Sequence, residues 1–83
     1  MEEEIGKVEH FFNHISVAAI NLTGPLHIND IIHFVGATTD FTQPVGSMEI
    51  NREKIEKATA GQSVGIKTLH RVREGDIVYK VIS

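Results

Sequence analysis

Histidine and carboxylate side chains are the groups in this sequence that could bind a metal or transfer protons. The histidines are His10, His14, His27, His33 and His70, and there is no cysteine. A zinc site needs three or four nitrogen, oxygen or sulfur ligands that the fold brings together. No HExxH pattern is present, and the alternation of His33 with Ile32 and Phe34 places its side chain on an outward face. We therefore expect surface histidines, no metal and no cofactor.

The hydroxyl groups of Thr38, Thr39 and Thr42 surround the carboxylate of Asp40 in the sequence. A catalytic hydroxyl also needs a base beside it, and the neighbouring sequence supplies none. Threonine and aspartate in turns more often cap free backbone amides. We expect no catalytic residue, and hence a protein that is not an enzyme.

The charge balance argues against a general attraction for nucleic acid. Eight basic and eleven acidic residues give a net charge of −3, so any contact with phosphate groups has to be local. A loose basic cluster lies in the last third of the chain and comprises Lys67, His70, Arg71, Arg73 and Lys80. We predict that binding uses part of this cluster and the loop before it in the sequence, namely Thr38, Thr39, Asp40, Gln43, Lys67, His70, Arg71 and Arg73.

The acidic start MEEEIGK lacks the basic and apolar regions of a signal peptide, and no apolar run is long enough for a membrane helix. The absence of cysteine fits a reducing compartment. We expect a cytoplasmic protein without a membrane partner.

The candidate binding residues lie on or beside segments that are predicted to be strands. Residues 26–50 predict a β-hairpin, because valine, isoleucine, phenylalanine and threonine dominate both arms around a loop at 36–40. Strands are also expected at 5–12, 15–22, 63–69 and 77–82, with Pro44 and Gly46 bending the long arm 41–50. Residues 51–60 predict an irregular connection pinned by Ile55.

About six short strands, each followed by a turn signal, predict a single all-β domain over residues 1–83, built as a small antiparallel closed barrel. Closure would remove exposed strand edges. Residues 1–4 are expected to be frayed.

Four stretches resemble the second domain of elongation factor Tu and other translation GTPases. Residues 24–30 resemble G-x-L-x-x-G-D, 47–50 resemble the strand ending in V-E-M, 60–65 match A-G-x-x-V-G, and 72–78 resemble I-x-x-G-x-V-L. The resemblance implies a six-stranded, Greek-key-like closed barrel. There is no G-x-x-x-x-G-K-[ST] loop, so this chain alone cannot bind GTP as those enzymes do.

The whole sequence, including residues 38–43, looks still more like free-standing elongation-factor-like proteins of prokaryotes and the C-terminal barrel of collagenase-like peptidases. The first likeness implies binding to tRNA, rRNA or the ribosome, with Glu49 at the position of the V-E-M glutamate and Ser63 at that of an asparagine. The second implies a protein-interaction accessory domain, with a collagenase-like peptidase as partner. A dimer formed through exposed phenylalanines is a third possibility.

Overall fold

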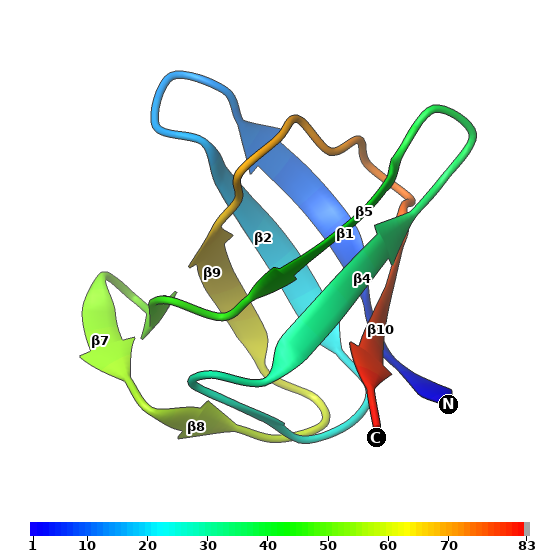
Figure 1. The fold of residues 1–83 in the computed structure, drawn as a ribbon. Coiled ribbons are helices and arrows are strands. Elements are labelled where there is room, and N and C mark those ends of the chain that lie inside the picture. The colour runs from blue at the N-terminus through cyan, green and yellow to red at the C-terminus, as the bar shows by residue number, and fades with distance from the viewer. Residues whose placement is uncertain (83) are drawn as a thin grey trace.

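A computed structural model describes residues 1–82, which form ten strands and no helix, and therefore no helix that could cross a membrane. Eight strands make one antiparallel sheet in the order β5-β4-β10-β1-β2-β9-β6-β7 (Figure 1). Their bounds are β1 Glu2–Phe12, β2 Val17–Leu22, β4 Ile31–Val35, β5 Asp40–Pro44, β6 Met48–Ile50, β7 Glu53–Ile55, β9 Ser63–Lys67 and β10 Ile77–Val81. The remaining two, β3 Leu26–His27 and β8 Lys57–Ala58, pair with each other.

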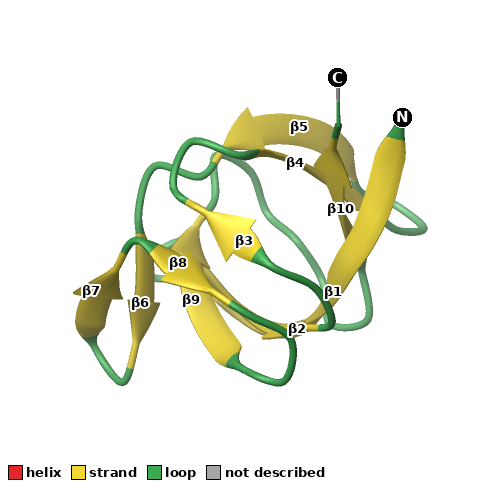
Figure 2. Cartoon of the chain, turned by 90° about the horizontal axis from the view of Figure 1, so that it is seen from below, coloured by secondary structure: helices red, strands yellow, loops and turns green. Residues whose placement is uncertain are grey.

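Alternation of side chains gives the curled sheet its core. On β4, Ile32 and Phe34 are fully buried, and they face Ile20 of β2 and Ile66 of β9, which are equally inaccessible. Figure 2, a view from below, shows the β3–β8 pair across the end of the curled sheet that faces the viewer. Leu26 of β3 belongs to the same core. The predicted all-β, antiparallel character is confirmed.

The predicted six-stranded closed barrel is wrong. In residues 1–82 the sheet has eight strands and two free ends, β5 and β7, with no backbone ladder joining them. The reason lies in the arm 40–50, which pairs with β4 through β5, bends at residues 45–47, and then pairs with β9 through β6. Beyond Pro44, Val45 still bonds to the residues before β4, because its amide donates to the carbonyl of Asp30 and its carbonyl accepts the amide of Asn29, both at 2.9 Å. The change of partner therefore comes at Gly46 and Ser47, which make no backbone hydrogen bond among the described residues.

The side chain of Gln43 bridges the gap that the ladders leave between β5 and the end of β9. Its Nε2 donates to the carbonyl of Lys67 at 2.9 Å, and its Oε1 accepts the amide of Leu69 at 2.7 Å. The residue is buried, so both hydrogen bonds are shielded from water. A primary amide imitates the donor and acceptor of a neighbouring strand here.

Two expectations about connecting segments are also wrong. Residues 1–4 are not frayed, because Glu2, Glu3 and Glu4 pair with β10. Residues 51–60 are not irregular, since they contain β7 and β8. Asn51 and Arg52, both with positive φ, make the two-residue turn into β7. The turn was not predicted because the pair Asn-Arg lacks the glycine that most such turns contain.

Gln43→Ala should lower the free energy of unfolding by about 2–4 kcal/mol, because it leaves the Lys67 carbonyl and the Leu69 amide without partners in a buried site. Chemical denaturation followed by circular dichroism measures this loss. Gln62→Ala is the matched control, since the side chain of exposed Gln62 accepts a hydrogen bond from the amide of Thr59 only. An equal loss in both variants would contradict the bridging role of Gln43.

Candidate functional site

A hollow of about 780 Å³ lies on the outer side of β2, β9 and β6. Its lining comes from these strands and from the turns at their ends: Phe12, Ile15, Val17, Ala19, Ser47, Glu49, Asn51, Arg52, Ser63, Val64, Gly65 and Lys67. We call it the β2–β9–β6 groove. Its volume is in the range of sites that hold small molecules or peptide side chains.

Small residues in the middle of two neighbouring strands, Ala19 of β2 and Gly65 of β9, make this surface concave. Gly65 of β9 stands opposite Ala19 of β2 and opposite Glu49 of β6. A Cβ atom at Gly65 would lie 3.3 Å from Cγ1 of Val17, so the side chain of Val17 would have to shift by a few tenths of an ångström to admit it. The outer face of these strands is therefore hollowed at Ala19 and Gly65 and bordered by larger residues at the turns.

Exposed apolar side chains border one end of the groove. Phe12 is 47% exposed and Ile15 is 59% exposed, both beside the turn between β1 and β2. Leu69, 70% exposed, is near this turn because the amide of Thr68 donates to the carbonyl of Ser16 at 2.8 Å. Apolar residues grouped at the edge of a concave surface are typical of a protein contact.

Three of the predicted binding residues, Glu49, Ser63 and Lys67, line this groove together. Glu49 is half-buried and Lys67 is exposed, so an acid and a base are both available to a partner. Ser63 is already engaged, because its hydroxyl donates to Oε1 of Glu9 at 2.8 Å.

The other predicted residues lie elsewhere. Arg73 donates through Nε to the hydroxyl of Thr38 at 3.0 Å, and the ring of His70 packs edge-on against Phe41. Thr39 is buried, as is Gln43, whose amide holds the sheet together.

The predicted basic cluster does not form one surface. Lys67 lines the groove, whereas Arg71 and Arg73 line a separate hollow of about 210 Å³ beside Phe11. Lys80 donates to the carbonyl of Pro25. The positive charges are spread over three places and do not form the single basic patch that binding to RNA phosphates was expected to use.

Asp40 belongs to a cluster around His33. The Nε2 atom of His33 lies 2.5 Å from Oδ1 of Asp40, and Nδ1 lies 2.8 Å from Oε2 of Glu2. A protonated imidazole donates to both carboxylates, which ties β1, β4 and β5 together. The hydrogen bond to Asp40, with help from Glu2 and against the effect of burial, raises the pKa of His33 above 6.5.

Among residues 1–82 no group of three or more potential ligands is arranged to hold a metal ion.

Sequence reasoning missed the apolar border of the groove and Arg52. The adjacent Phe11 and Phe12 left open whether a bulge shifts the register of β1. The structure has such a shift between Val8 and His10, which packs Phe11 against the core and leaves Phe12 exposed. The pair of phenylalanines was thus the only signal of this surface in the sequence.

Comparison with known proteins points to peptidases. The chain is 47% identical over 77 residues to an uncharacterized protease of Methanocaldococcus jannaschii, and 35% identical over 78 residues to a collagenase of Porphyromonas gingivalis. Each alignment covers 92% of this chain but only 19% and 22% of the relative, so the chain spans about one fifth of their length. No family model matches the sequence.

The fold has a counterpart among solved structures. The C-terminal domain of a Geobacillus thermoleovorans protein described as a U32 peptidase superposes with a TM-score of 0.90, with 18% identity, over 96% of this chain and 93% of that domain. At this identity the match concerns the fold alone.

These comparisons correct the assignment to translation factors. The relatives are named as a protease and a collagenase, not as elongation factors, so the expected translation role and the tRNA, rRNA and ribosome partners are not supported. The likeness to collagenase-like peptidases is the one that the comparisons confirm. The turn motifs misled because they specify how strands are connected rather than what the surface binds.

The stabilising effect of His33 should depend on pH. Since its pKa is raised on folding, its contribution is complete below pH 6.5 and is lost as the pH rises through the folded-state value. We expect urea midpoints of the parent and His33→Gln to differ more at about pH 5.5 than at about pH 8.5. His14→Gln, in an exposed turn, controls for the loss of a histidine. A difference that grows toward high pH would contradict the raised pKa.

Proposed function

We propose that this chain is a non-catalytic accessory domain that docks on protein, of the kind joined to the catalytic part of collagenase-like peptidases. The observation that carries the proposal is the mismatch in coverage: nearly the whole chain aligns with only a fifth of each peptidase. The superposable solved structure is likewise a C-terminal domain. Such a module supplies binding rather than the reaction.

The arrangement of titratable groups supports a binding role. In His33 both ring nitrogens face carboxylates, and His10 lies 3.4 Å from Glu74 on the exposed surface. In the described part of the chain no serine or threonine hydroxyl is hydrogen-bonded to a histidine ring. A nucleophile activated by a neighbouring base requires that contact.

The β2–β9–β6 groove is the surface that we propose for docking. Phe12 and Ile15 expose apolar surface whose burial against a partner would be favourable, while Glu49 and Lys67 supply one negative and one positive charge. Interfaces commonly combine an apolar centre with polar groups that set the orientation. The partner that we propose is the catalytic part of a collagenase-like peptidase.

The test uses the M. jannaschii relative without the stretch that matches this chain. We expect the purified chain to bind this truncated protease in isothermal titration calorimetry. Ile15→Glu should weaken binding about tenfold, because it places a charge in an apolar contact. Since Ile15 is already exposed, the variant should keep the parent's stability.

Ile31→Glu is the matched control, because Ile31 is also exposed but lies on β4, away from the groove. It should bind as the parent does. Equal weakening by both variants would place the contact elsewhere. If the parent chain shows no binding tighter than about 1 mM, the docking function itself is wrong.

A further inference from the structure

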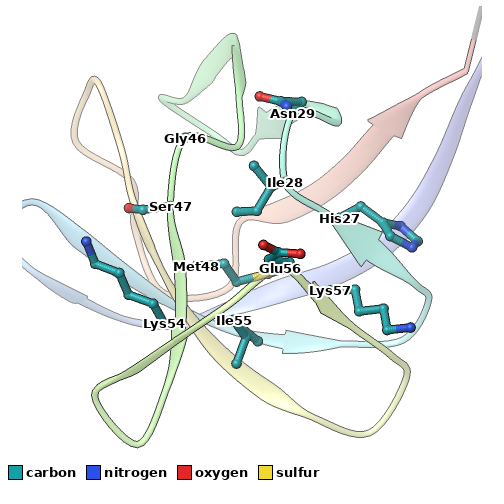
Figure 3. A pocket seen from close by; sticks show the side chains of 10 residues that line it. All are labelled: His27, Ile28, Asn29, Gly46, Ser47, Met48, Lys54, Ile55, Glu56 and Lys57. Carbon is teal, nitrogen blue, oxygen red and sulfur yellow. The ribbon is translucent and has the colours of Figure 1, made fainter.

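A second hollow, of about 690 Å³, lies between the β3–β4 turn, the bend at 45–47 and the β7–β8 segment. Figure 3 shows Ile28, Met48, Ile55 and the carboxylate of Glu56 in its middle, with Lys54 and Lys57 on opposite sides. Met48 is buried, whereas Ile28 and Ile55 are half-buried and pack against the core. These three side chains give the hollow an apolar floor with the carboxylate of Glu56 beside it, and we call it the Lys54–Lys57 hollow.

The charges around this hollow are predominantly positive, in contrast to the net charge of the chain. Its lining includes the two ammonium groups of Lys54 and Lys57, against the single carboxylate of Glu56. Neither lysine belongs to an ion pair within residues 1–82, although Glu49 stands opposite Lys54 in the β6–β7 ladder. Asp30 also lies nearby, but it is hydrogen-bonded to the amide of His27. Both ammonium groups remain available to an acidic ligand.

The bend at 45–47 supplies unused backbone groups along one wall. In the described structure, Gly46 and Ser47 belong to no strand, and their amides and carbonyls make no backbone–backbone hydrogen bond. An extended peptide uses such groups when it adds itself to a strand edge. The wall also has free space, because a Cβ atom at Gly46 would have no atom within 4 Å.

From this combination we infer that the Lys54–Lys57 hollow binds an extended peptide segment in which acidic residues flank an apolar one. The apolar side chain enters the space between Ile28, Met48 and Ile55. The flanking carboxylates accept charge-assisted hydrogen bonds from Lys54 and Lys57. This site is distinct from the β2–β9–β6 groove and does not depend on docking there.

The probe is the heptapeptide Gly-Asp-Ala-Leu-Ala-Asp-Gly, blocked at both ends and titrated at low ionic strength into ¹⁵N-labelled protein. We expect amide shifts concentrated at Ile28, Gly46, Ser47 and Ile55. Lys57→Glu should raise the Kd about tenfold, and higher salt should weaken binding. Gly46→Leu should also weaken binding, because its side chain occupies the hollow.

Lys7→Glu, an exposed lysine on β1 outside the hollow, is the matched control and should stay within about twofold of the parent. Dispersed amide spectra of each variant establish that it is folded. The inference is overturned if shifts lie elsewhere or are absent at millimolar peptide. It is equally overturned if peptides with lysine for aspartate, or glycine for leucine, bind as well as the probe.

Discussion

The structure depends on how the arm 40–50 is held between two parts of the sheet. Backbone hydrogen bonds hold its first half, as far as Val45, to β4 and the residues before it, and its second half to β9, but within residues 1–82 no ladder closes the gap between β5 and β9. The buried amide of Gln43 crosses that gap with one hydrogen bond donated and one accepted. Because the partners are backbone groups shielded from water, no apolar side chain can replace it without leaving them unpaired.

Both hollows follow from the position of this arm. Ser47 lines the β2–β9–β6 groove and the Lys54–Lys57 hollow, so the bend separates the two surfaces. The groove is concave because Ala19 and Gly65 face each other on its floor, and the hollow exists because the small β3–β8 pair stands apart from the main sheet. The arm thus lines both candidate binding surfaces, one through Gly46, Ser47 and Met48 and the other through Ser47 and Glu49.

Much of the fold was predictable from local sequence. The alternation of Ile32 and Phe34 with polar residues specifies β4 and its buried face, and Asn29, which has a positive φ, marks the turn before it. The topology was harder, because an open sheet with a bent arm and a closed ring of strands have the same pattern of apolar residues and differ in which strands pair. Gln43 was predicted to bind a ligand, yet it binds the chain's own backbone. Distant contacts of this kind leave no trace in spacing or composition.

The groove was only partly predictable. Glu49, Ser63 and Lys67 do meet there, but through strand pairings between segments far apart in the chain. Its apolar border depends on a register shift in β1, which no local propensity specifies. Among the basic residues near the C-terminal end, Arg71 and Arg73 line one hollow, whereas Lys67 and Lys80 lie elsewhere, so nearness in the sequence did not predict one basic surface.

Hydrogen exchange at the Leu69 amide tests the central claim most directly. Leu69 lies outside every strand and its side chain is exposed, so nothing but the Gln43 bridge should protect its amide. We predict that this amide exchanges nearly as slowly as that of Ile66 in β9, and far more slowly than that of His70. Exchange of the Leu69 amide as fast as that of His70 would contradict the account.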